Sequence, residues 1–101
     1  MSANVEAYRV DYRSGRTTYY LIDGETLDLD FELPANNIGN NFDVNAVRSA
    51  IAGAQRGVVV YPAFKHRTQQ AGCIGYMVWI AGRHVTYYGR KGESHIERFP
   101  D

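Results

Sequence analysis

The residues best suited to catalysis lie near the C-terminal end, where His84, Glu93 and His95 occur with Arg90 and Lys91. A metal-independent ribonuclease needs a general base, a general acid and a cation that binds the phosphate, and these residue types can supply all three. Their spacing matches no single mechanism, and polar residues of this kind are common in turns. A small metal-independent ribonuclease is therefore the third of three hypotheses for function.

The single cysteine, Cys73, has no surrounding motif that would make it a nucleophile. A nucleophilic cysteine needs a base and an orienting group within reach. Its neighbours Gly72 and Ile74 indicate instead a small core residue at the start of a strand. One cysteine excludes an internal disulfide and cannot by itself form a zinc site. We predict no catalytic residue, no metal site and no cofactor.

Acidic and apolar residues alternate over residues 27–33, which read LDLDFEL. This period of two predicts a strand whose apolar residues face the core and whose other face carries Asp28, Asp30 and Glu32, here called the acidic row. Alternate residues on a strand lie about 6.6 Å apart, which favours separate solvated carboxylates over one shared ion. The acidic row is a candidate surface for binding a protein partner, whose nucleic-acid groove it could occupy by charge mimicry.

Charge is segregated along the chain, although the formal net charge is zero. Residues 1–47 hold eight acids against three arginines, whereas residues 48–92 hold seven lysines and arginines and no acid. Cations follow phosphates and aromatic rings stack on unpaired bases, which predicts a nucleic-acid surface in the region 61–91. This basic set comprises Lys65, Arg67, Arg83, Tyr87, Tyr88, Arg90 and Lys91. The acidic first half opposes that interpretation unless the two halves are separated in space.

The positions of the candidate residues in the C-terminal half depend on the stretch 73–89, which contains the only Trp and the longest apolar run. A two-residue turn at residues 82–83 would pair Ile80 with Val85. One face of this hairpin would then present Tyr76, Val78, Ile80, Val85 and Tyr87, and the other face Met77, Trp79, His84, Thr86 and Tyr88. Because both faces are largely apolar, we expect the hairpin to lie at the centre of a sheet.

Further strands are predicted over residues 5–12, 17–22, 27–33, 58–61 and 94–99. Two-residue turns at residues 14–15 and 23–24 would put the first and third strands' apolar residues on opposite faces of the second. An extra residue near Asp23-Gly24 would remove this conflict. One helix is expected over about residues 43–55, with Asp43 as its N-cap and Gly57 as its terminator. Residues 63–72 have the composition of a polar, basic loop.

The predicted fold class is α+β: a single domain over residues 1–101, with one α-helix (about 43–55) packed on a mostly antiparallel sheet of five to seven strands. A hydrophobic content of 45% and a charged content of 22% are typical of soluble globular proteins. No apolar run approaches the ~20 residues of a membrane helix, and the N-terminus has no signal-peptide pattern. We therefore expect a cytoplasmic protein with no membrane partner.

The favoured hypothesis is a small non-catalytic interaction protein that binds a macromolecular partner, with a protein preferred. It would act as an inhibitor or accessory factor of the kind that phages and mobile elements encode. Eight tyrosines fit a strand-rich fold and also a contact surface. A nucleic-acid-binding domain is the second hypothesis. A homodimer is a further one, because an acidic strand of one copy could meet the basic set of another.

Overall fold

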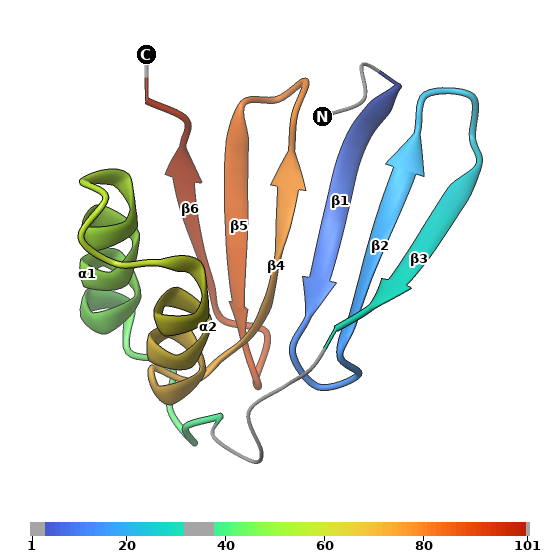
Figure 1. The fold of residues 1–101 in the computed structure, drawn as a ribbon. Coiled ribbons are helices and arrows are strands. Elements are labelled where there is room, and N and C mark those ends of the chain that lie inside the picture. The colour runs from blue at the N-terminus through green and yellow to red at the C-terminus, as the bar shows by residue number, and fades with distance from the viewer. Residues whose placement is uncertain (1–3, 32–37, 101) are drawn as a thin grey trace.

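The computed structural model describes residues 4–31 and 38–100 and has an α+β fold, as predicted. In chain order the elements are β1 (Val5–Asp11), β2 (Arg16–Leu21), β3 (Thr26–Asp30), α1 (Val44–Gln55), α2 (Tyr61–Gln70), β4 (Cys73–Trp79), β5 (His84–Gly89) and β6 (Ser94–Arg98). The strands form one antiparallel sheet in the order β3-β2-β1-β4-β5-β6. Both helices lie on one side of this sheet, beside its β4–β6 half (Figure 1). In the described ranges, neither helix is long and apolar enough to cross a membrane.

The first helix agrees with the sequence analysis. Asp43 Oδ1 accepts a hydrogen bond from the backbone N–H of Ala46 at 3.1 Å, which caps the N-terminus of α1. Gly57 has a φ of 76°, a conformation that favours glycine, and it lies just after the end of the helix. The buried face of α1 consists of Val47, Ala50, Ile51 and Gly53.

The prediction of a single helix is wrong, because residues 61–70 form α2 instead of a strand end and a loop. Pro62 lies in the first turn, where its missing N–H costs nothing. The buried face of α2 includes the polar residues Thr68 and Gln69 beside Phe64. Residues 61–70 therefore lack the apolar repeat by which an amphipathic helix is recognised from sequence. Residues 58–60 do not form a strand either. The N–H groups of Val58 and Val59 both bond to the Gly53 carbonyl of α1.

The central hairpin has the predicted faces but not the predicted register. Val78 pairs with Val85 and Trp79 with His84, so the connection is longer than two residues. Side chains alternate with a period of two, and the register differs from the prediction by two residues, so every residue stays on its predicted face. The β1–β2 connection is also longer than expected, because Asp11 pairs with Arg16.

The β2–β3 connection contains the predicted extra residue. Leu21 donates its N–H to the Glu25 carbonyl at 2.9 Å, which leaves the three residues 22–24 in the loop. Gly24 adopts a φ of 92° within it. One face of the sheet, the face that bears the helices over β4–β6, consequently carries Tyr8 and Val10 of β1, Tyr19 and Leu21 of β2, and Leu27 and Leu29 of β3.

The strand order separates the two charge halves. β1, β2 and β3 come from the acidic part of the chain and form one half of the sheet, whereas β4 and β5 come from the basic part and lie in the other. The core lies between the helices and the β1–β4–β5 region. Tyr12 is fully buried there, and its hydroxyl lies 2.8 Å from the Thr68 hydroxyl of α2. This bond ties the end of β1 to the helical layer.

Candidate partner-binding groove

An apolar groove of about 720 Å³ lies on the helix-bearing face of the sheet, over the half that the helices leave open. Cross-strand pairing aligns Leu27, Tyr19 and Tyr8 in one row, and Leu29, Thr17 and Val10 in the next. The N-terminal turn of α2 forms one wall. We call this the Tyr–Leu groove, and its main lining residues are Val5, Tyr8, Tyr19, Leu21, Leu27 and Tyr61.

The prediction that the apolar residues of residues 27–33 face a closed core is wrong for Leu27 and Leu29, whereas Phe31 is partly buried against the core. Leu27, Leu29 and Tyr61 each leave about half of their surface exposed. Alternation places the two leucines on the predicted face, but in the described ranges no helix lies over β3 (Figure 1). The floor of the groove is therefore an apolar surface in contact with solvent.

Most polar side chains that line the groove are tyrosines, and the other is Thr17. The Tyr8 and Tyr19 rings lie 5.4 Å apart between centroids, and the Tyr61 and Tyr76 hydroxyls are 3.1 Å apart. Burial raises the pKa of Tyr8, with smaller contributions from Tyr19 and Tyr61. A neutral hydroxyl of raised pKa is a poor general base near pH 7 but a good hydrogen-bonding group. These contacts suit recognition rather than catalysis.

The cation of Lys65 lies at the margin of this groove. Its Nζ is 4.5 Å from the centroid of the Phe31 ring and 5.2 Å from that of Tyr61. Cation–π attraction at such distances holds the side chain over both aromatic rings. Lys65 is thus the one member of the basic set that the structure places beside the Tyr–Leu groove.

The acidic row lies on the opposite face of β3 from the leucines. Asp28 Oδ1 accepts a hydrogen bond from the Thr18 hydroxyl at 2.6 Å, and Asp30 Oδ1 accepts one from Arg16 Nε at 3.2 Å. Arg16 also lies 4.0 Å from Asp28, so one guanidinium serves two exposed carboxylates. Glu32, the third predicted member, lies outside the described residues.

The structure does not bring the basic set together. Tyr87 is buried in the core beneath Phe64, so its ring cannot stack on a base. Arg90 donates hydrogen bonds to the carbonyls of Ile38 and Gly39, which gives it a structural role. The remaining members are dispersed: Arg67 is on α2, Tyr88 is half-buried on the helix-free face, Arg83 is in the β4–β5 connection, and Lys91 is in the β5–β6 turn. Arg83 and Lys91 flank β5 at opposite ends, about 20 Å apart.

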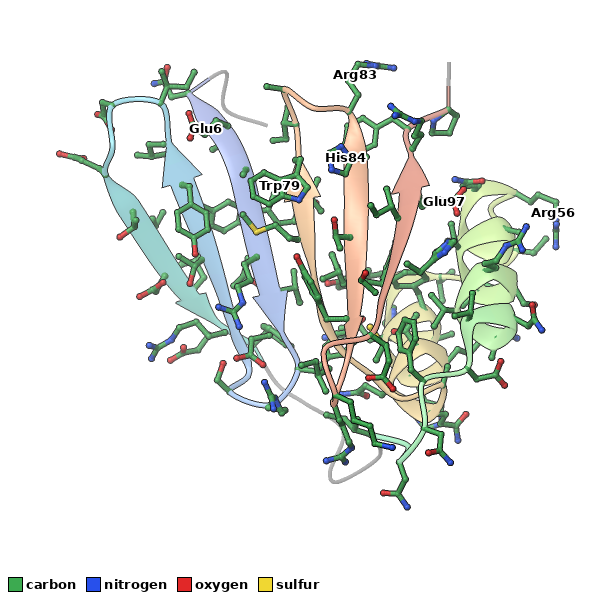
Figure 2. All side chains as sticks on the ribbon, turned by 180° about the vertical axis from the view of Figure 1, so that it is seen from behind. Glu6, Arg56, Trp79, Arg83, His84 and Glu97 are labelled. Carbon is green, nitrogen blue, oxygen red and sulfur yellow. The ribbon has the colours of Figure 1, made fainter. Side chains whose placement is uncertain are left out.

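The candidate ribonuclease residues are also separated. His84 pairs with Trp79 on the helix-free face, where Figure 2 shows both side chains, whereas His95 pairs with Tyr87 on the helix-bearing face. His95 Nε2 lies 3.0 Å from Glu97 Oε1. One phosphodiester cannot contact both histidines through the sheet, so they cannot act as the acid and base of one site.

Cys73 is buried, as predicted. Its thiol lies 3.1 Å from the Gly75 carbonyl, and burial raises its pKa to about 11. A thiol with a raised pKa stays protonated and is unreactive near neutral pH. Within the described part of the chain, no group of three His, Cys, Asp or Glu residues could hold a metal ion.

Sequence reasoning missed the Tyr–Leu groove, although one signal was present. Tyrosine outnumbers phenylalanine and tryptophan together, and its apolar ring with a polar tip suits half-buried surfaces. The groove depends on how far the helical layer extends over the sheet, and the position of α2 determines that extent.

The fold and groove define a class: a small α+β protein whose two helices cover half of an open antiparallel sheet. The chain belongs to the DUF1398 family, described as a protein of unknown function, and the match covers residues 1–97. No curated protein matches the chain significantly.

Proposed function

We propose that this protein is a small non-catalytic interaction protein that binds another protein through the Tyr–Leu groove, as an inhibitor or accessory factor. The observation that supports this proposal is the exposed apolar floor over β1–β3. Large contiguous apolar patches on a folded protein mark interaction sites, because leaving them in water is unfavourable. The floor continues directly from the buried core, so a partner that covers it completes the helical layer.

The chemistry of the lining supports a protein partner. Tyrosine is enriched at protein interfaces, where its ring is buried and its hydroxyl finds a partner. Tyr8, Tyr19 and Tyr61 offer rings and hydroxyls along one groove, with Leu27 as an aliphatic contact. Among the described residues, the lining of the groove includes no carboxylate or histidine that could act as a general base.

Nucleic acid remains the alternative partner class. The strand that borders the groove, β3, carries Asp28 and Asp30 on its other face, where carboxylates repel phosphates, and the members of the basic set are dispersed. A fluorescence titration with single-stranded RNA, single-stranded DNA and duplex DNA at two salt concentrations tests this alternative. Binding that weakens steeply with salt would favour it over the protein partner. We propose that the protein acts in the cytoplasm, where its single buried thiol would stay reduced.

Site-specific photo-crosslinking in cells tests the proposal. A photoreactive residue at Leu27, on the groove floor, should give one discrete crosslinked protein. The same residue at Ile96, an exposed strand position on the helix-free face of β6, is the matched control and should not. Tyr61→Ala should abolish the Leu27 crosslink, whereas Val58→Ala, in the connection before α2, should preserve it. Equal crosslinking from Leu27 and Ile96, or none from Leu27, would overturn the proposal.

A further inference from the structure

Among the described strands, β3 lies at an edge of the sheet and has no neighbour on its outer side to pair with its backbone N–H and C=O groups. It lies at one end of the strand order, and all five of its residues are exposed. Two bonds define which residues face β2: Leu21 donates to the Glu25 carbonyl at 2.9 Å, and Phe31 donates to the Gly15 carbonyl at 2.8 Å. Bonded and non-bonded pairs alternate in an antiparallel ladder. The N–H and C=O groups of Thr26, Asp28 and Asp30 therefore point away from the sheet.

The side chains of β3 define what such an edge would accept. Leu27 and Leu29 lie on the groove side, and Asp28 and Asp30 lie on the other. Directly opposed residues on neighbouring strands interact, and opposite charges there are stabilising. A strand added to β3 would bury apolar side chains beside the leucines and place basic side chains beside the aspartates.

We infer that β3 accepts an extended segment of the partner protein in which apolar residues alternate with lysine or arginine. This inference rests on the proposed function, because the apolar residues of the added strand would extend the floor of the Tyr–Leu groove. Main-chain hydrogen bonds supply affinity in strand addition, and alternate side chains supply specificity. Asp23 and Glu25, in and beside the β2–β3 loop, add to the negative charge at this edge.

A second copy of this chain is a poorer occupant. In antiparallel pairing of two β3 strands, residues whose N–H groups point outward oppose each other. In the register that pairs all three outward-pointing residues, Asp28 would lie opposite Asp28 of the other copy, and like charges in that position are destabilising. The other edge, β6, has no matching pattern, because its helix-bearing side carries His95 and Glu97 instead of apolar residues. The charge pattern therefore selects a different, basic chain.

Binding of synthetic peptides tests the inference. The probes are a nine-residue peptide of alternating Val and Lys, its Val and Glu counterpart, and a Val and Lys peptide with the two residue types in separate blocks. Binding is followed by fluorescence anisotropy and by amide shifts in NMR spectra. We expect only the alternating Val and Lys peptide to bind, with the largest shifts at Thr26, Asp28 and Asp30.

Three variants locate the contact. Thr26→Pro removes an outward N–H, which an edge strand tolerates, and should weaken binding by about fivefold. Ser94→Pro is its matched control: Ser94 is the first residue of the other edge strand, and its N–H also points outward because Gly89 bonds to Glu93. Asp28→Lys with Asp30→Lys should weaken binding of the Val and Lys peptide by about tenfold and create binding of the Val and Glu peptide.

The outcomes separate the two proposals. Failure of all peptides to bind, equal binding of the Lys and Glu peptides, or equal effects of Thr26→Pro and Ser94→Pro would overturn strand addition. A Leu27 crosslink in cells that persists in the Thr26→Pro protein would then leave the groove as the partner site. Weaker peptide binding in Thr26→Pro, together with a weaker Leu27 crosslink, supports both.

Discussion

The two halves of the sheet carry similar residues on one face and differ in what covers them. Leu27, Tyr19, Tyr8, Val78 and Val85 follow one another in a single row across five strands. Val78 is 7% exposed because the helices lie over the β4–β6 half, whereas Leu27 is 53% exposed at the far end of the same row. An apolar residue in a strand is thus a core residue in one half and a candidate contact in the other.

Because the helices cover only one half of the sheet, the two halves are expected to have different roles: one stabilises the fold and the other binds the partner. The β4–β6 half packs against Phe64 and Ile51 of the helices and carries most of the core. The β1–β3 half contributes Val10 and Tyr12 to that core but leaves β2 half-buried and β3 exposed. Substitutions in the first half should therefore lower stability, and substitutions on the groove floor should lower binding.

The largest expected effect is the loss of stability when an aspartate replaces an apolar residue in the covered half, compared with the same replacement in the open half. Val78→Asp buries an unpaired carboxylate and should lower the free energy of unfolding by about 4 kcal/mol or prevent folding. Leu27→Asp, in the same row but half exposed, should cost about 1 kcal/mol or less. Urea denaturation of both variants measures the difference. Equal losses would mean that β3 is covered in solution and would contradict the comparison.

The second-largest expected effect is that alkaline pH destabilises the covered half of the sheet. Burial raises the pKa of Tyr12, Tyr76 and Tyr87 above their usual range. Each hydroxyl therefore keeps its proton in the folded state at a pH where the unfolded chain has lost it, so stability is complete below about pH 10 and falls as the pH rises. At pH 11 each buried tyrosine should cost about 1.4 kcal/mol.

Urea denaturation between pH 8 and 11 measures this slope. Tyr87→Phe should make the decline shallower, because one ionisable group is removed from the core. The stability of the Tyr87→Phe protein at pH 8 serves as the reference, because it already includes any loss of packing caused by the substitution. A decline of the same steepness in the wild-type and Tyr87→Phe proteins would show that other groups govern alkaline unfolding.

The smallest expected effect concerns the anchoring of the helical layer. Asp43→Ala removes the N-cap of α1 and should cost about 1 kcal/mol, whereas Asp43→Asn should cost much less because asparagine also caps helices. Thermal unfolding followed by circular dichroism measures both. The Leu27 crosslink should be unchanged in both variants, since α1 contributes nothing to the groove lining. Reduced crosslinking in Asp43→Ala alone would mean that the two halves are coupled.

Much of the fold could be predicted because local patterns determine it. The N-cap at Asp43, the terminator at Gly57 and the extra residue in the β2–β3 loop all act within a few residues of the chain. Face assignments in the central hairpin were correct although the register was wrong by two, because a shift by two preserves the side on which each residue lies.

The candidate site could not be predicted in the same way. The helix α2 has a partly polar buried face, with Thr68 and Gln69, and its first turn resembled the end of a strand. The acidic row was identified with Asp28 and Asp30 on one face, but its pairing with Arg16 depends on the register of β2 against β3. The dispersal of the basic set, with Tyr87 buried, depends on how helices and hairpin pack together.

The sequence by itself determined the secondary-structure class, the faces of the strands and the division of charge along the chain, because each depends on residue types and a local period. Only the tertiary structure decided that the two charge halves occupy separate halves of the sheet and that Leu27 and Leu29 remain exposed. Burial depends on which element lies over a strand, and that is set by contacts between residues far apart in the chain. The Tyr–Leu groove exists because two helices cover half of a six-stranded sheet.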